Sequence, residues 1–220
     1  MIKALSLCGL RYLILCPGSR SAPLAAAAHI VSGKTNLKIL TSIDERSAGF
    51  LALGLSTSSS SPTAVLTTSG TAVANLLPAA VEADRSCQPL LFLTADRPLR
   101  LKNCGANQTV NQEDFLKAVC RFYTSTPKSG LEDLSIASIE PLTKKLWALL
   151  NDLPGPVHLN IPIEEPLLSK NLQIESIKEN LDFYKFSSES KSSKEITRNQ
   201  DFNFTKDKLD FSKPGIILIG

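Results

Sequence analysis

Several features that define large classes of protein are scarce or missing in this sequence of 220 residues. Its five cysteines are odd in number and widely spaced, with no Cys-x-x-Cys pair. This argues against a disulfide framework and favours reduced thiols in a cytoplasmic protein. No apolar run approaches the roughly 18 residues that a membrane span needs. A P-loop and a Gly-x-Gly-x-x-Gly turn are also missing, so nucleotide binding through either motif is poorly supported.

Neither sign of charge dominates, and histidine is rare. Lys and Arg number 24 against 21 Asp and Glu, for a net charge of +3. That excess is too small for a nucleic-acid-binding surface but compatible with a small anionic substrate. The two histidines, His29 and His158, lie far apart, and neither has a cysteine or an acid at metal-ligand spacing. We therefore interpret both as structural and predict no metal site in this chain.

Short apolar runs alternate with helical patterns, and no hairpin signal separates them. Strands are predicted over 12–16, 37–41, 64–68, 90–94, 121–125 and 157–161. This alternation is typical of right-handed crossovers between parallel strands. The sequence therefore predicts an α/β fold, a mostly parallel six-stranded sheet with helices on both faces.

Helices are predicted in the intervals between the strands, over about 22–31, 112–119 and 136–151 and directly after residues 44 and 70. Pro78 is expected to kink the helix that contains it. The serine-rich stretch 56–61 is expected to be a polar loop. The helix after Asp44 has an apolar stripe formed by Ala48, Leu51, Ala52 and Leu55.

Three segments of different composition indicate the domain organisation. Residues 1–168 carry the alternating pattern and form one domain. Residues 169–213 are polar and rich in Ser and Lys, as in a linker. Residues 214–220 are interpreted as the first strand of a truncated central domain, because a lone apolar strand cannot pair its edges. The chain is therefore expected to be the N-terminal part of a longer protein.

The predicted topology locates a site before any family is considered. In a parallel sheet the loops after the first four strands emerge at one edge, where ligands of open α/β sheets bind. These loops are 17–21, 42–46, 69–71 and 95–108, and they are the segments richest in Gly, Ser, Asp, Arg and Asn. Arg20 and Arg97 could each grip a carboxylate with two hydrogen bonds, although surface ion pairing also explains an isolated arginine.

Asp44 and Glu45 stand where a strand meets a helix. Capping alone accounts for both, because an acid at the N-cap or in the first turn stabilises the positive end of a helix. A functional role for Glu45 depends on its neighbours in the other loops.

Six blocks of sequence occur together in a fixed order: 16–24 (CPGSRSAPL), 44–50 (DERSAGF), 68–76 (TSGTAVANL), 93–98 (LTADRP), 104–108 (CGANQ) and 155–162 (GPVHLNIP). Together they closely resemble the N-terminal pyrimidine-binding domain of thiamine-diphosphate enzymes. Within that superfamily they are most similar to the 2-succinyl-5-enolpyruvyl-6-hydroxy-3-cyclohexene-1-carboxylate synthases of menaquinone and phylloquinone biosynthesis. The resemblance covers about residues 4–166.

The resemblance implies a transferase that depends on thiamine diphosphate and Mg²⁺, decarboxylates 2-oxoglutarate and adds the succinyl unit to isochorismate. It implies that Glu45 is the catalytic, cofactor-binding residue and activates the cofactor through N1′ of its aminopyrimidine ring, whereas Asp44 remains a cap. It also implies a substrate pocket formed by Ser19, Arg20, Arg97, Asn107 and Gln108.

The sequence departs from this family at the metal site. The family holds Mg²⁺ and the diphosphate through a Gly-Asp-Gly motif in a C-terminal domain, and no glycine here is followed by Asp. We therefore expect these ligands on a missing domain, a homo-oligomer at full length, and no turnover by this chain alone. Two alternatives remain: a catalytically incomplete remnant that acts at most as a binding module, and another thiamine-diphosphate 2-oxo-acid carboligase or decarboxylase.

Overall fold

The computed structural model of the chain describes residues 1–130 and 133–167. These residues belong to the first predicted domain, 1–168. The predicted linker, 169–213, and the predicted start of a central domain, 214–220, lie outside the described residues.

The described residues form a six-stranded sheet in the order β2-β1-β3-β4-β6-β5, in which every neighbouring pair is parallel. The predicted parallel sheet is thus confirmed. Each strand lies within two residues of its predicted position. The strands are β1 (Tyr12–Leu15), β2 (Lys38–Thr41), β3 (Thr63–Thr67), β4 (Leu90–Asp96), β5 (Phe122–Ser125) and β6 (Pro156–Pro162).

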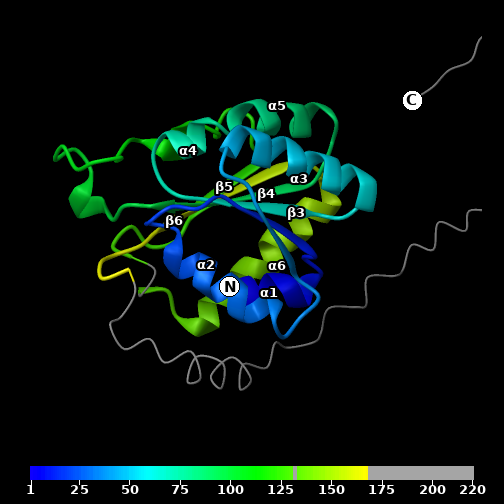
Figure 1. Ribbon diagram of the computed structural model, residues 1–220, viewed down its shortest axis with the longest axis horizontal. Coiled ribbons are helices and arrows are strands. Elements are labelled where there is room, and N and C mark those ends of the chain that lie inside the picture. The colour runs from blue at the N-terminus through cyan, green and yellow to red at the C-terminus, as the bar shows by residue number, and fades with distance from the viewer. Residues whose placement is uncertain (131–132, 168–220) are drawn as a thin grey trace, which may run out of the picture. The chain divides into compact units, whose positions relative to one another are not determined.

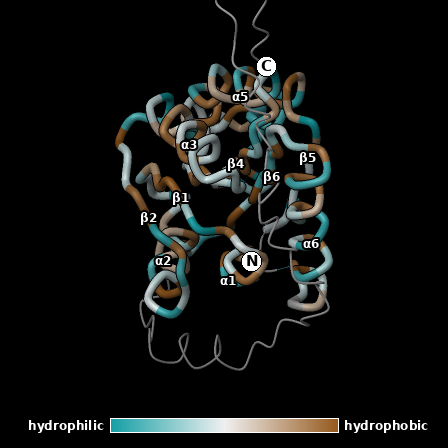
Figure 2. The backbone as a smooth tube through the Cα atoms, turned by 90° about the vertical axis from the view of Figure 1, so that its right-hand side faces the viewer, coloured by the Kyte–Doolittle hydropathy of each residue, from teal (hydrophilic) through white to brown (hydrophobic). Residues whose placement is uncertain are grey.

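Helices cover both faces of this sheet (Figures 1 and 2). One face carries α1 (Ile2–Cys8), α2 (Ala22–Ser32) and α6 (Ile136–Asp152). The opposite face carries α3 (Glu45–Ser59), α4 (Thr71–Ala74) and α5 (Leu77–Arg85). Two short 3-10 turns, η1 (Leu99–Leu101) and η2 (Gln112–Asp114), follow β4. The predicted α-helix over 112–119 is therefore wrong, because only η2 forms in that stretch.

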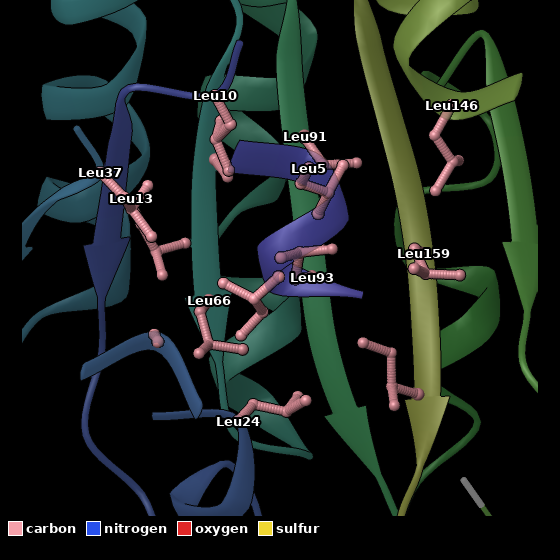
Figure 3. Packing of buried hydrophobic residues seen from close by; sticks show 14 of the residues in the cluster. Leu5, Leu10, Leu13, Leu24, Leu37, Leu66, Leu91, Leu93, Leu146 and Leu159 are labelled. Atoms are coloured by element: carbon pink, nitrogen blue, oxygen red, sulfur yellow. The ribbon is translucent and has the colours of Figure 1, made fainter. Parts of the chain in front are cut away.

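Alternation of side chains along the central strands builds two apolar layers. Leu13 of β1 and Leu91 of β4 pack toward α1, whose Leu5 reaches the sheet (Figure 3). The next residues along these strands, Ile14 and Phe92, belong to the opposite layer with α3 and α5. Because both faces are covered, the central strands are apolar on both sides, which explains their continuous hydrophobic runs.

Small residues bring α3 close to its neighbours. Ala48 and Ala52 are fully buried as predicted, but Leu51 of the predicted stripe is 43% exposed. The buried line instead includes Gly49, where a built Cβ atom would lie only 2.7 Å from the Cβ of Ala79 in α5. The helix therefore packs through its smallest side chains, and the larger leucine is left facing outward.

Two other expectations concern helix ends. The serine-rich stretch is not a loop from residue 56, because α3 continues through Ser59. The hydroxyl of Ser56 is buried against the carbonyl of Pro89, and the hydroxyl of Ser59 bonds back to the carbonyl of Leu55. The predicted kink near Pro78 is confirmed as a break: α4 ends at Ala74, and α5 begins with the proline in its first turn.

Candidate functional site

The carboxyl ends of the parallel strands form a common rim, which we define by the loops after β1, β2, β3, β4 and β6. The strand order reverses between β1 and β3: α2 follows β1 on one face, and α4 follows β3 on the other. Ligands of open α/β sheets bind at such a switch point. The loop after β1 lies directly on the end of β3, since a Cβ atom at Gly18 would come within 2.4 Å of the Cβ of Thr68.

Glu45 occupies the rim at the first position of α3. Asp44 before it is the N-cap, and its Oδ1 accepts a 2.7 Å hydrogen bond from the backbone N–H of Ser47, which confirms its predicted capping role. The Glu45 side chain is half-buried, and its Oε2 accepts a 3.2 Å hydrogen bond from Nδ2 of Asn75. Among the described residues no donor reaches Oε1, so half of the carboxylate is open to a ligand.

Cys16 directly follows β1, and the charge of the Glu45 carboxylate affects the pKa of its thiol. Burial and, to a smaller extent, the negative charges of Glu45 and Asp44 together raise the pKa of its thiol to about 12. The buried thiol is therefore protonated and inert at neutral pH, so it adds no charge near Glu45.

Arg20, in the loop after β1, is buried rather than exposed to solvent. Its Nη1 donates a 2.9 Å hydrogen bond to the carbonyl of Ile163, and its Nη2 donates a 2.8 Å bond to Oε1 of Glu165. Both acceptors belong to the segment that follows β6, so this guanidinium joins the two sides of the rim.

Arg97, directly after β4, is held by the loops after β3 and β4. Its Nη1 donates to the hydroxyl of Ser69 and, at 3.0 Å, to the carbonyl of Gln108. The Gln108 side chain donates in turn to the Ser69 carbonyl at 2.8 Å. These three residues form a closed set of hydrogen bonds that fixes one guanidinium at the rim.

The two arginines share one electrostatic environment. Partial burial lowers the pKa of Arg97, and the positive charge of Arg20 lowers it further. The carboxylates of Asp96 and Glu165 act in the opposite direction. Arg20 and Arg97 are therefore near enough to repel each other, and an anion between them would relieve that repulsion.

A buried polar network lies beneath Arg97. Asp96 is 1% exposed, and its Oδ2 accepts 2.8 Å hydrogen bonds from both Lys102 and Asn160. Lys102 also donates to Glu113 at 2.6 Å, and Gln112 donates to Asn160 at 2.9 Å. The network ties the loop after β4 to the ends of two strands. A cleft of about 30 Å³ opens beside it, lined in part by Arg97, Tyr123 and Lys128.

His158 lies deeper in β6 and belongs to the same network. Its Nε2 is 2.7 Å from the hydroxyl of Thr94, which itself donates to Oδ1 of Asn160. The Thr94 oxygen must therefore accept from Nε2–H, which leaves Nδ1 unprotonated and buried without a partner among the described residues. Burial lowers the pKa of His158 to about 4, against a weaker raising effect of the Glu113 charge. This agrees with its interpretation as a structural residue.

All the residues predicted for the site lie at the rim, Glu45 at the start of α3 and the others in the rim loops, but not all are in contact. Arg97 and Gln108 are joined directly, and Arg20 acts on Arg97 through its charge. Ser19 and Asn107 have exposed side chains. Among the described residues, Glu45 makes no hydrogen bond or ion pair with an arginine.

Sequence reasoning missed several residues of the rim. Asn75, which contacts Glu45, lies within the block 68–76 but has no predicted role, and Glu165, which contacts Arg20, lies outside all six blocks. The buried network left a detectable signal: Thr94 and Asp96, and likewise His158 and Asn160, alternate as polar residues in otherwise apolar strands. Such a pattern indicates one polar stripe on a buried face.

Two kinds of feature are missing from the described residues. They contain no group of three or more His, Cys, Asp or Glu arranged to hold a metal ion. No helix within them has the length and apolar character required to cross a bilayer.

A family model and several relatives that are similar to this chain all point to the same group of enzymes. The family model of the thiamine pyrophosphate enzyme N-terminal TPP binding domain matches residues 1–116. The chain is 50% identical over 221 residues to the 2-succinyl-5-enolpyruvyl-6-hydroxy-3-cyclohexene-1-carboxylate synthase of Prochlorococcus marinus (strain NATL1A), covering all of this chain and 37% of that protein.

Two further relatives carry the same name and are 62% identical over 159 residues, which is 72% of this chain. They come from Prochlorococcus marinus (strain MIT 9313) and Synechococcus sp. (strain WH7803). The matched segment spans 27% and 28% of these two proteins, respectively.

Proposed function

Because this chain belongs to the thiamine pyrophosphate enzymes, through their N-terminal TPP binding domain, we propose that it is the N-terminal part of a thiamine-diphosphate-dependent synthase. The proposed reaction decarboxylates 2-oxoglutarate and adds the succinyl unit to isochorismate. The name shared by the relatives supports this reaction. The single observation that carries it is a half-open carboxylate, Glu45, on the same rim as two arginines.

Glu45 fits the pyrimidine end of the cofactor. Its Oε2 is held by Asn75, and its Oε1 is open to share a proton with N1′ of an aminopyrimidine ring: it donates to N1′ as a carboxyl group and accepts from N1′–H as a carboxylate. The nearby thiol of Cys16 is buried and protonated, so it adds no competing charge. When bound, thiamine diphosphate supplies the nucleophilic carbon and the electron sink for decarboxylation. In the proposed reaction, the role of this chain is to hold the aminopyrimidine ring and to keep a proton at Glu45.

Arg20 and Arg97 fit substrates that carry several carboxylates. A guanidinium donates paired hydrogen bonds in a fixed geometry, so it fixes the orientation of a carboxylate as well as its charge. Ser69 and Gln108 hold Arg97 in place before any ligand arrives, which lowers the entropy lost on binding. Ser19 and Asn107 are exposed on the same rim, and we propose that they complete the substrate pocket.

Magnesium and the diphosphate need other residues. The described residues offer no cluster of metal ligands, and the relatives are much longer than this chain. We propose that these groups are bound by parts of the full-length protein that correspond to the remainder of the relatives. We also propose that the full-length protein is a homo-oligomer and that the 220-residue chain alone does not turn over substrate.

A chimera tests the proposal. The aligned N-terminal segment of the Prochlorococcus marinus (strain NATL1A) relative is replaced by this chain, and CO₂ release from 2-oxoglutarate is measured with and without isochorismate. Glu45→Gln should reduce turnover by about 10²–10⁴-fold, as expected for loss of proton transfer. Asp44→Asn is the matched control, since asparagine also caps a helix, and it should leave turnover unchanged.

Two results would contradict the proposal. A Glu45→Gln chimera as active as its parent would remove the catalytic role of this carboxylate. A chimera that releases CO₂ from pyruvate in preference to 2-oxoglutarate would favour another 2-oxo-acid carboligase or decarboxylase.

A further inference from the structure

Glu165 follows β6 and makes a one-point contact with a buried arginine. Its Oε1 lies 2.8 Å from Nη2 of Arg20, and the exposed fractions of the two side chains are 59% and 5%. The buried guanidinium therefore receives its compensating charge from a carboxylate that faces solvent and can move away.

The guanidinium of Arg20 is incompletely paired. Nη1 donates to the carbonyl of Ile163, but Nε is buried with no hydrogen-bond partner among the described residues. A buried donor without an acceptor lowers stability, so such atoms are rare in folded proteins. Nε and Nη2 lie on the same edge of the guanidinium, and a carboxylate aligned with that edge accepts from both. Glu165 reaches only one of them.

The charge of the same carboxylate also reaches the second arginine. Its negative charge acts on Arg97, where it opposes the effect of the neighbouring Arg20. Asp96, the other acid near Arg97, is already bonded to Lys102 and to Asn160. Glu165 is thus the exposed acid that balances the two rim arginines.

We propose that Glu165 is a specificity-determining residue, an internal carboxylate that occupies Arg20 in the free protein and is displaced by a carboxylate of the substrate. This inference rests on the proposed function and names a class of ligand for it: a small acid with at least two carboxylates, one for each arginine. An internal competitor is present at a high effective concentration. A ligand with a single weak contact is therefore excluded, whereas one that pairs with Nε and Nη2 of Arg20 and also reaches Arg97 can replace it.

The test is a titration of the complete chain with succinate at constant ionic strength. The readout is the ¹⁵N–¹H signal of the Arg20 Nε–H group, assigned by its disappearance in Arg20→Lys. Glu165→Gln removes the competing charge and should tighten succinate binding about fivefold, the order expected for an ion pair with one exposed partner. The readout needs neither cofactor nor turnover, so it is independent of the chimera assay.

Glu164→Gln is the matched control. Glu164 pairs with Arg100, and its carboxylate accepts a 2.8 Å hydrogen bond from the backbone N–H of Glu165. Glutamine retains that acceptor while removing one negative charge from the same two-residue segment. Succinate affinity in this variant should stay within about twofold of the parent, because Arg20 keeps its internal partner.

Three outcomes would overturn the inference. Equal or weaker binding by Glu165→Gln would mean that Glu165 positions Arg20 instead of competing for it. The same gain in both glutamine variants would reduce the effect to general electrostatics. An Arg20 signal that succinate does not perturb in any variant would remove the carboxylate subsite, while the Glu45→Gln chimera would still judge the proposed function separately.

Discussion

His158 should make the stability of the fold depend on pH in the mildly acidic range. The imidazole is buried, and burial lowers its pKa from 6.5 to about 4. In the unfolded chain the ring takes up a proton near pH 6.5, whereas the folded chain keeps it neutral until about pH 4. The unfolded state therefore binds more protons between these values, and the free energy of unfolding falls as the pH is lowered through this window.

The size of this effect follows from the two pKa values. One pKa unit corresponds to about 1.36 kcal/mol, so the difference between 6.5 and about 4 contributes about 3 kcal/mol to the free energy of unfolding at neutral pH. Most of this contribution is lost by about pH 4.5. The structural cause is specific: the Thr94 oxygen accepts from Nε2–H, and a second proton on Nδ1 would be buried with no acceptor among the described residues. A loss of this size is a large part of the stability of a typical domain.

The assay is urea denaturation of the complete chain at several pH values from 7 to 4.5. His158→Leu has nearly the same volume and no titratable group, so its unfolding free energy should fall much less steeply over this range than that of the parent; the remaining slope comes from groups such as the N-terminus, whose pKa burial lowers to about 6. Tyr123→Phe is the control: the ring of Tyr123 meets His158 edge-on at 5.2 Å, and its removed hydroxyl has a pKa raised by burial to about 12. This variant should keep the full pH dependence. An equally steep decline in His158→Leu would refute the reasoning.

Three further predictions concern packing, charge and thiol chemistry. Gly49→Ala should destabilise the fold by about 1–3 kcal/mol in thermal denaturation, because its Cβ atom would lie 2.7 Å from the Cβ of Ala79, and an unchanged melting temperature would contradict this. Lys102→Met should lower the free energy of unfolding by about 3–5 kcal/mol, because it leaves Asp96 buried without its cation. Urea denaturation at pH 7 measures this loss. Iodoacetamide at pH 8 should modify the exposed cysteines but not Cys16, whose buried thiol has a pKa of about 12; mass spectrometry that finds Cys16 alkylated in folded protein would refute its burial.

The positions of the strands could be predicted because each one is a short apolar run with its own boundary signals, and their parallel direction could be predicted because helices alternate with them. Their order within the sheet was not predicted. The packing face of α3 could not be predicted, because apolar size is not what decides it. Leu51 matches the helical period but is exposed, whereas Gly49 lies buried against α5. The predicted end of α3 is also wrong. The prediction relies on the serine-rich composition, which is typical of a loop, but the helix continues through Ser59. Tertiary contact with Pro89 and hydrogen bonds back to the preceding turn keep that stretch helical.

The rim could be predicted from topology alone, because parallel strands bring their following loops to one edge. The pairing of individual side chains within it could not. Arg20 and Glu165 are separated by 145 positions in the sequence, and their contact depends on β6 lying beside β4 at the right register. Asn75 is placed by the break between α4 and α5, whose exact position only the structure shows.

The two arginines of the rim differ in how their charges are compensated, and this difference underlies the selectivity that we propose for the site. Asp96 adjoins Arg97 in the chain, but its Oδ2 is committed to Lys102 and Asn160, and its Oδ1 accepts the backbone N–H of Arg97. No carboxylate among the described residues is therefore bonded to the Arg97 guanidinium, and neutral oxygens of neighbouring loops fix its position. Arg20 is compensated by an exposed carboxylate, so any ligand that reaches it must first replace that group. A ligand with one carboxylate gains at Arg97 only, whereas a ligand with two also recovers the cost of exchange at Arg20, and discrimination between them follows without any steric barrier.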